Sequence, residues 1–258
     1  YIYDFGAGLR YLPTLLKFDG ISEIYLVDPN ENLDISYNNL KKIFLNKKSI
    51  KKFKVGISNK NAKLTYYPAK VSTGSSFLNL NNRDRYDDEY FGKNKSVIKN
   101  VYDFQKFKKK FKLNQADVVK IDVEGFEINI LKSILKKDKP LIIEVELNFE
   151  DSIIGNTFNE ANHLMWKNNY KLATMNNVFK KLTSEEFISG DYHNPIYRNS
   201  LSQSDCHYIL KKRNYTIRDI IILIGYGFLE DAYKNILKIK KENTFQVTEL
   251  KSLLKRIM

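Results

Sequence analysis

The chain of 258 residues has very few of the residues that build disulfide frameworks and metal cages. Cys206 is the only cysteine, so no disulfide or thiolate cage can form within the chain, and we expect a reducing, cytoplasmic environment. The three histidines, His163, His193 and His207, do not have the spacing of a histidine metal motif. The sequence therefore predicts no dedicated metal-ligand set.

Long apolar runs and arginines are also scarce. The apolar run 220–224 is far shorter than the roughly 20 residues that cross a bilayer, so no transmembrane segment is predicted. Arg, which suits bidentate contacts to phosphates and bases, occurs at only seven positions, although the formal net charge is +13. The excess is mostly Lys spread along the chain, as an A/T-rich genome can produce. We therefore do not expect a nucleic-acid partner.

A glycine is missing from what would otherwise be a dinucleotide-binding turn. Residues 3–8, Y-D-F-G-A-G, end a short apolar strand, but no third glycine follows to complete G-x-G-x-x-G. Asp4 precedes the turn, where its charge suits a cationic ligand group. Asp28 follows the next strand, 20 positions after Gly8 (28 minus 8), a spacing typical of an acid that binds ribose hydroxyls. A ligand with a ribose, an amino group and no phosphate is S-adenosylmethionine.

Apolar strands alternate with amphipathic helices, which predicts an α/β fold with a doubly wound, mostly parallel sheet. The predicted strands are 2–5, 24–27, 53–57, 117–123, 141–147, 170–175 and 207–210, and the predicted helices are 9–18, 33–44, 128–135 and 158–168. Residues 63–99 are expected to form a hairpin and a long loop.

We predict one domain over residues 1–214, with its first strand truncated at the start because the chain opens at Tyr1 inside that strand. Residues 215–258 are predicted to form a helical tail that begins at a capping box between Thr216 and Asp219. We expect the tail to pack on the domain or to mediate a homo-oligomer, with binding to a membrane surface as the alternative.

Charged side chains gather at the predicted carboxyl ends of two buried strands: Lys120, Asp122, Glu124, Glu144 and Glu146. Ligands of open α/β sheets bind outside these strand ends, so we expect the acids to converge there with Asp4 and Asp28. Buried acids are usually paired or functional. The structural alternative is an ion pair between Lys120 and Asp122, with Glu127 only capping the next helix.

At this motif the chain resembles the FkbM-type family of S-adenosylmethionine-dependent methyltransferases. Residues 120–125 and Glu127 match its hallmark K-I-D-V-E-G-x-E letter for letter. The family's D-x-G-A-x-x-G motif is matched by Asp4, Gly6 and Ala7, with Gly8 arriving early, and its E-P corresponds to Asp28-Pro29. Looser matches are Gly56 to Asn59 for its A-L-S-D turn, Ser75-Ser76 for its serine pair, and Glu144 or Glu146 for the glutamate ending its fifth strand.

The resemblance implies a seven-stranded, Rossmann-like class I methyltransferase that transfers a methyl group to a hydroxyl on a sugar, glycolipid or polyketide-like acceptor. The implied cofactor-binding residues are Asp4, Gly6, Ala7, Gly8, Asp28, Pro29, Ser58 and Asp122. The catalytic candidates are Asp122 and Glu124, with Glu144 in support. These carboxylates could take the proton of the acceptor hydroxyl or hold a divalent cation, whose involvement is left open.

Three other functions compete with this interpretation. A nucleic-acid methyltransferase is favoured by the net charge, but the N/D-P-P-Y motif of adenine enzymes and the Pro-Cys pair of cytosine enzymes are absent. A non-catalytic, methyltransferase-like scaffold would bind no cofactor. An NAD-dependent oxidoreductase is disfavoured by Asp4 and by the missing third glycine, because both oppose binding of a pyrophosphate.

Overall fold

The computed structural model describes residues 1–7, 21–43, 49–69, 75–79, 95–149, 157–180, 201–239 and 244–257. The chain divides into two compact units, one formed mainly by residues 22–210 and the other mainly by residues 211–258. The predicted helix 9–18 and Gly8 lie outside the described residues. Within the described ranges, every helix is too short or too polar to span a bilayer.

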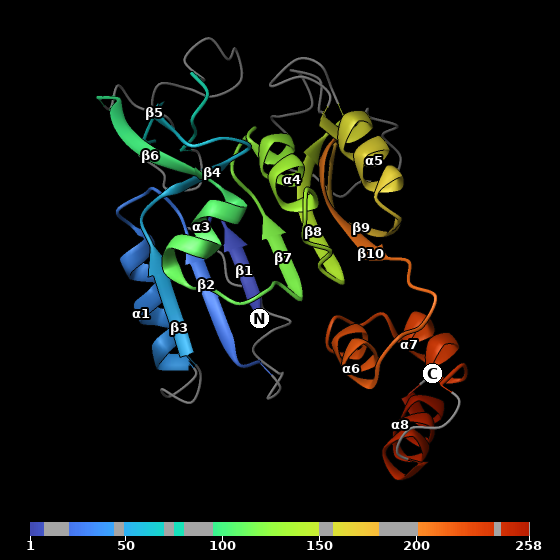
Figure 1. Ribbon diagram of the computed structural model, residues 1–258. Coiled ribbons are helices and arrows are strands. Elements are labelled where there is room, and N and C mark those ends of the chain that lie inside the picture. The colour runs from blue at the N-terminus through green and yellow to red at the C-terminus, as the bar shows by residue number, and fades with distance from the viewer. Residues whose placement is uncertain are drawn as a thin grey trace, which may run out of the picture. The chain divides into compact units, whose positions relative to one another are not determined.

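A seven-stranded sheet forms the centre of the first unit (Figure 1). Its strand order is β3-β2-β1-β7-β8-β10-β9. The bounds of these strands, in that order, are Ser49–Phe53, Glu23–Val27, Ile2–Phe5, Val118–Ile121, Ile142–Asn148, Leu201–Leu210 and Tyr170–Lys180. Neighbouring strands from β3 to β8 are parallel, whereas β10 is antiparallel to both β8 and β9. The predicted doubly wound, mostly parallel sheet is confirmed.

The predicted third strand, 53–57, is wrong. The third strand of the main sheet is β3, which ends at Phe53, and residues after it enter a separate three-stranded sheet of order β4-β6-β5. The strands of that sheet are β4 Gly56–Ser58, β5 Ala62–Tyr66 and β6 Val97–Asp103. Strand β3 was not predicted because Lys51 and Lys52 interrupt its apolar pattern. Charged residues are tolerated there because β3 is an edge strand, and these lysines pair with Glu23 and Asp34 at the surface.

The apolar core lies between the main sheet and three helices, α3 Phe104–Phe111, α4 Glu127–Leu135 and α5 Thr157–Lys167. Figure 1 shows these helices over one face of the sheet. Phe104 of α3 packs edge-on against Phe5 of β1, with ring centroids 5.8 Å apart. Helix α3 was not predicted, although the Asp103 side chain caps it by accepting hydrogen bonds from the backbone amides of Gln105 and Lys106. Helix α1 Leu33–Ile43 packs against β2 and β3.

Strand alternation separates this apolar core from a charged row on the same sheet. Tyr3, Val119 and Ile143 belong to the core cluster, so the next residue of each strand points to the opposite face. In the strand register those next residues, Asp4, Lys120 and Glu144, lie beside one another on β1, β7 and β8. The sheet therefore carries buried charges in register, next to the strand ends where a ligand would bind.

The second unit is helical, with α6 Ile217–Gly225, α7 Leu229–Ile236 and α8 Thr244–Ile257. The predicted capping box is confirmed: Thr216 and Asp219 exchange side-chain-to-backbone hydrogen bonds at the start of α6. Helix α7 was not predicted as a separate element, and α8 lies in the tail that was expected to be helical.

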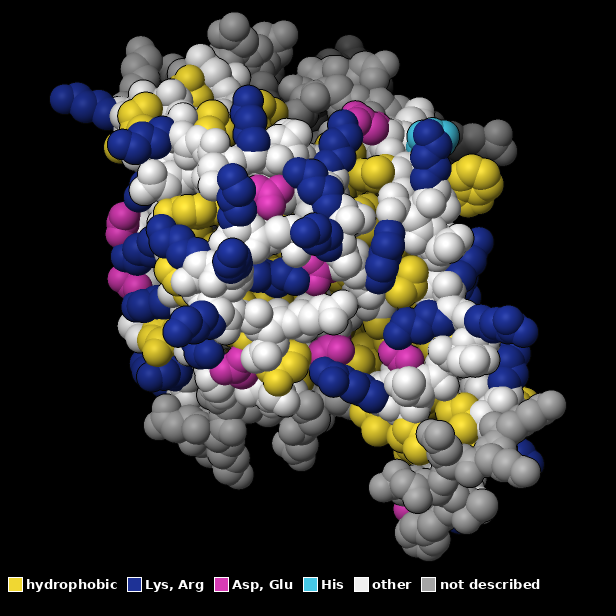
Figure 2. Space-filling view, in the orientation of Figure 1, with side chains coloured by type: hydrophobic (Ala, Val, Ile, Leu, Met, Phe, Trp, Pro, Cys, Tyr) yellow, Lys and Arg dark blue, Asp and Glu magenta, His cyan; other side chains and the backbone are white. Residues whose placement is uncertain are grey.

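Lysines are scattered over the visible face of the molecule rather than gathered into one stripe (Figure 2). Among the described residues, several lysines are paired with acids: Lys132 with Glu160, Lys136 with Asp103, and Lys108 with Asp138.

Candidate functional site

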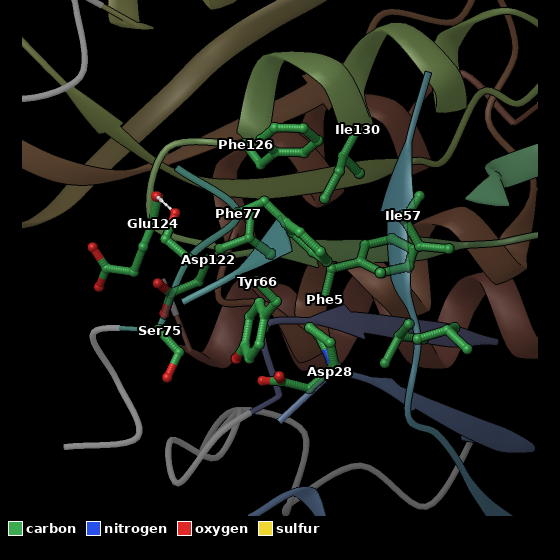
Figure 3. A pocket seen from close by; sticks show the side chains of 17 residues that line it. Phe5, Asp28, Ile57, Tyr66, Ser75, Phe77, Asp122, Glu124, Phe126 and Ile130 are labelled. Atoms are coloured by element: carbon green, nitrogen blue, oxygen red, sulfur yellow. Dashed lines mark hydrogen bonds between the residues drawn. The ribbon is translucent and has the colours of Figure 1, made fainter. Parts of the chain in front are cut away.

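A cavity lies at the carboxyl ends of β1, β2 and β7, where acids were expected to converge (Figure 3). The strand ends contribute Phe5, Gly6, Val27, Asp28, Pro29, Asp122, Val123 and Glu124, and the flanking segments contribute Val55, Gly56, Ile57, Tyr66, Ser75, Ser76, Phe77, Phe126 and Ile130. One wall is therefore acidic and another is largely aromatic and aliphatic, which suits a ligand with a polar and an apolar part.

Gly6 brings the ends of β1 and β7 into contact at this cavity. Its backbone has φ +77°, in the region that favours glycine, and its N–H donates to the Val27 carbonyl at 3.0 Å. A Cβ atom at Gly6 would lie 1.6 Å from the Asp122 carbonyl oxygen. The glycine is thus required by a close approach of two strand ends, in addition to the turn itself.

Asp28 is a buried acid at the end of β2 that lines the cavity. Its Oδ1 accepts a hydrogen bond from the Asn30 amide at 2.7 Å. Burial raises the pKa of Asp28 to about 6, against the lowering effect of that hydrogen bond. Asp28 is therefore largely ionised at neutral pH, as an acceptor for ribose hydroxyls should be.

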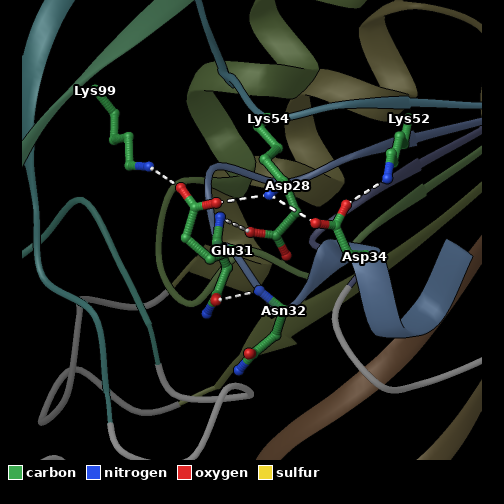
Figure 4. A network of polar contacts seen from close by, with 8 residues as sticks. Asp28, Glu31, Asn32, Asp34, Lys52, Lys54 and Lys99 are labelled. Atoms are coloured by element: carbon green, nitrogen blue, oxygen red, sulfur yellow. Dashed lines mark hydrogen bonds and ion pairs between the residues drawn. The ribbon is translucent and has the colours of Figure 1, made fainter.

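Ion pairs hold the loop that follows Asp28 (Figure 4). Glu31 pairs with Lys54 at 2.6 Å and with Lys99 at 3.0 Å, and Asp34 pairs with Lys54 at 2.9 Å. Exposed pairs of this kind add little stability singly. Their arrangement links the loop after β2 to β6 and to the segment after β3, and so helps to orient the backbone around Asp28.

Lys120 and Asp122 form the ion pair that the structural alternative predicted. The Lys120 Nζ lies 3.0 Å from Asp122 Oδ2 and 3.7 Å from Asp4 Oδ1. Burial lowers the pKa of Lys120, but the charges of Asp122 and Asp4 outweigh it, so the net shift is upward. Burial raises the pKa of Asp4 to about 7 although Lys120 opposes the shift. The pairing does not remove Asp122 from the site, because Asp122 also lines the cavity.

Glu127 holds the loop between β7 and α4. Its Oε1 accepts from the backbone amides of Val123 at 3.2 Å and Gly125 at 2.9 Å. Burial raises its pKa to about 7. Glu124 and Gly125 both have positive φ, 54° and 104°, so the loop is tightly turned. Glu127 therefore binds backbone amides of the loop that precedes α4, whereas the alternative interpretation expected it to cap the helix. Glu124, in the turn that Glu127 holds, lines the cavity.

Three acids cluster beside the cavity. Asp122, Glu124 and Glu146 each offer an oxygen within 4.8 Å of the others, an arrangement that could surround a cation or a polar acceptor. Burial and the neighbouring acids raise the pKa of Glu146. Glu144 lies elsewhere, 3.4 Å from the imidazole of His207. Of the two glutamates that the sequence left open, Glu146 is thus the one beside Asp122 and Glu124.

The structure brings five of the predicted site residues to one cavity: Gly6, Asp28, Pro29, Asp122 and Glu124. Asp4 and Glu144 lie in the buried charged row beside it. Ala7 and Ser58 are buried but are not among the lining residues. Gly8 is outside the described residues.

Sequence reasoning missed most of the aromatic wall. Tyr66 and Phe77 pack with ring centroids 5.1 Å apart, and Phe77 lies 5.6 Å from Phe126. The wall is assembled from β5, from residues 75–77 and from the x position of the K-I-D-V-E-G-x-E motif. No periodic pattern connects these segments. The only feature of the sequence that could have pointed to this wall was the match of Ser75-Ser76 to the serine pair of the family, because Phe77 follows directly.

A sheet of this strand order, with an acid-lined cavity where the order reverses between β1 and β7, is a doubly wound, Rossmann-like α/β fold. The Methyltransferase FkbM domain matches residues 6–172. The chain therefore belongs to the FkbM methyltransferase family, and membership of this family implies use of S-adenosylmethionine. No curated protein matches the chain.

Solved structures that resemble the chain are methyltransferases of low sequence identity. An FkbM methyltransferase from Methylobacillus flagellatus KT is 12% identical, with a TM-score of 0.45 over 81% of this chain and 43% of that chain. A putative methyltransferase from Thermoplasma acidophilum is 12% identical, with a TM-score of 0.40 over 82% of this chain and 68% of that chain. A putative tRNA (m1A22) methyltransferase from Streptococcus pneumoniae is 10% identical, with a TM-score of 0.40 over 99% and 91%. The chain thus spans less than half the length of the first of these proteins.

Proposed function

We propose that this chain is an S-adenosylmethionine-dependent O-methyltransferase that acts on a hydroxyl of a sugar, glycolipid or polyketide-like small molecule. The observation that carries the proposal is the single cavity in which an acid at the end of β2 and acids at the end of β7 lie on either side of the Gly6 turn. We also propose a cytoplasmic location and self-association through the helical tail.

The polar and apolar side chains around the cavity fit S-adenosylmethionine. Asp28 would accept from the ribose hydroxyls, and the wall formed by Ile57, Tyr66 and Phe77 would cover the adenine ring. Asp4, held beside Lys120 below Gly6, would add negative potential near the amino group. Acids predominate among the polar side chains of the wall, as suits a cationic nucleoside better than a pyrophosphate.

Methyl transfer is an in-line displacement, so the protein must align the acceptor oxygen and exclude water. When bound, S-adenosylmethionine supplies an electrophilic methyl group on a sulfonium. Asp122 would accept the proton that the acceptor hydroxyl loses when its oxygen is methylated. Glu124, on the same loop, would orient the acceptor.

The neighbouring Glu146 has a different role in this proposal. Burial and the nearby charges of Asp122 and Glu124 raise its pKa and favour the protonated form, which would donate a hydrogen bond to the acceptor. Asp122 accepts a hydrogen bond from the Lys120 ammonium, whose charge favours the ionised carboxylate, the form in which Asp122 can take up a proton. Glu144 would support the site from the charged row, through Lys120.

Changing Asp122 to Asn tests the proposed base. We expect Asp122→Asn to retain S-adenosylmethionine binding and to lower methyl transfer at least about tenfold, because the amide cannot take up the acceptor's proton. Binding is measured by calorimetry with S-adenosylhomocysteine, and transfer by radiolabelled methyl incorporation into a panel of sugars, glycolipids and polyketide alcohols.

Asp138→Asn is the matched control for this experiment, since Asp138 is also a buried acid paired with a lysine but does not line the cavity. It should leave methyl transfer unchanged. Equal turnover by Asp122→Asn and the wild type would remove Asp122 from the mechanism. Absence of any cofactor binding by the wild type would favour the non-catalytic scaffold.

A further inference from the structure

A buried lysine lies behind the proposed base. Lys120 is 6% exposed, and its Nζ donates a hydrogen bond to Asp122 Oδ2 at 3.0 Å. The lysine stem is flexible, with a compact charge at its end. In this protein the charge is confined, because the adjacent strands place Asp4 on one side of Lys120 and Glu144 on the other.

The acids around Lys120 are not equivalent. Asp122 receives the hydrogen bond, whereas Asp4 Oδ1 lies farther away, at 3.7 Å, and makes no hydrogen bond although Asp4 is only 3% exposed. Glu144 is paired with His207 on β10. The ammonium is therefore directed at Asp122, and the other two acids restrict where it can move.

A purely structural role would need only one buried pair, and apolar residues of similar volume often replace such pairs without loss of stability. The unequal contacts of Lys120 with the three acids affect a side chain that lines the cavity. The hydrogen bond from Lys120 restrains the side-chain torsions of Asp122, and Asp122 is the member of this group that lines the cavity. Geometry of this kind governs whether a base can reach a proton, since displacements of about 1 Å can cost about a hundredfold in rate.

We propose that Lys120 is a positioning residue for methyl transfer, which acts by orienting the carboxylate of Asp122 toward the acceptor. The inference rests on the proposed function, and it adds a residue that is not among those lining the cavity. Lys120 acts through Asp122, while Asp4 and Glu144 keep its ammonium in place.

A double-mutant cycle tests this coupling. We expect Lys120→Met to lower kcat at least about tenfold while the KM for S-adenosylmethionine and the affinity for S-adenosylhomocysteine stay within about threefold. Lys120→Arg, which keeps a cationic donor, should recover most of kcat. In the Asp122→Asn background, Lys120→Met should have no further effect on kcat, because its partner is already lost.

The control is Lys108→Met, which removes another lysine paired with a buried acid, Asp138, in a part of the fold that does not line the cavity. It should leave kcat and KM unchanged. If Lys120→Met does not fold, Lys120→Gln, which removes the charge but keeps a polar side chain, takes its place in the cycle.

Four outcomes overturn the inference. Additive losses in the cycle would mean that Lys120 does not act through Asp122. Equal loss of cofactor affinity and kcat, or failure of both Lys120 variants to fold while Lys108→Met folds, would assign Lys120 to the stability of the sheet. Absence of methyl transfer by the wild type on every acceptor would instead overturn the proposed function itself, and the positioning role with it.

Discussion

Replacing Gly6 by alanine is expected to abolish cofactor binding and to destabilise the first unit. The new Cβ would lie 1.6 Å from the Asp122 carbonyl oxygen, and φ at this position is +77°. Overpacking and the left-handed backbone together should lower the free energy of unfolding by about 3 kcal/mol or more. The ends of β1 and β7 would have to separate, which would move Asp122 away from Asp28. Thermal unfolding and calorimetry with S-adenosylhomocysteine measure the two effects.

Gly227 offers a matched control for this substitution. It has nearly the same backbone angle, φ +80°, but a Cβ there would have no heavy atom within 4 Å. Gly227→Ala should therefore cost only the backbone strain, about 1–2 kcal/mol, and leave cofactor binding intact. If Gly6→Ala and Gly227→Ala were equally mild and Gly6→Ala still bound cofactor, the close approach of the two strand ends would be refuted.

Replacing Asp28 by alanine is expected to weaken S-adenosylhomocysteine binding by about ten- to a hundredfold, which corresponds to about 1.4–2.7 kcal/mol. A buried carboxylate that accepts from ribose hydroxyls leaves those hydroxyls without partners when it is removed. Asp34→Ala is the control, because Asp34 lies on α1, pairs with Lys52 and Lys54, and is half-exposed outside the cavity. Unchanged affinity of Asp28→Ala by calorimetry would show that the ribose binds elsewhere.

The same acid gives the binding a pH dependence. Burial raises the pKa of Asp28 to about 6, so the side chain is ionised above that pH and protonated below it. A protonated Asp28 loses acceptor capacity, and S-adenosylhomocysteine affinity should fall as the pH is lowered from about 7 through 6. The Asp28→Ala variant should show a weaker dependence over this range.

Much of the candidate site was predictable because its chemistry is concentrated in short motifs. The positions of Asp28 and Asp122 after buried strands were enough to place both acids at the carboxyl edge of a parallel sheet, where both line the cavity. The K-I-D-V-E-G-x-E motif carried the family, which the FkbM domain match over residues 6–172 confirms. No comparable short motif in the sequence indicates which acceptor is methylated.

Other features depended on contacts between distant segments. The sequence could not choose between Glu144 and Glu146, because both alternate to the same face of β8 and differ only in their distance from the strand end. The third strand was predicted at 53–57 because the lysines of β3 interrupt the apolar pattern that indicates a buried strand. Sequence reasoning missed the aromatic wall, which three separate segments build around Phe77.

The sequence by itself determined the alternation of strands and helices, the glycine turn and the acids at the strand ends, because these follow from local periodicity and short-range geometry. Only the tertiary structure decided that Lys120 lies between Asp4 and Glu144, that Glu146 joins Asp122, and that Gly6 contacts the Asp122 backbone. Strand order and register set these relations, and both are determined by the packing of residues that are far apart in the chain.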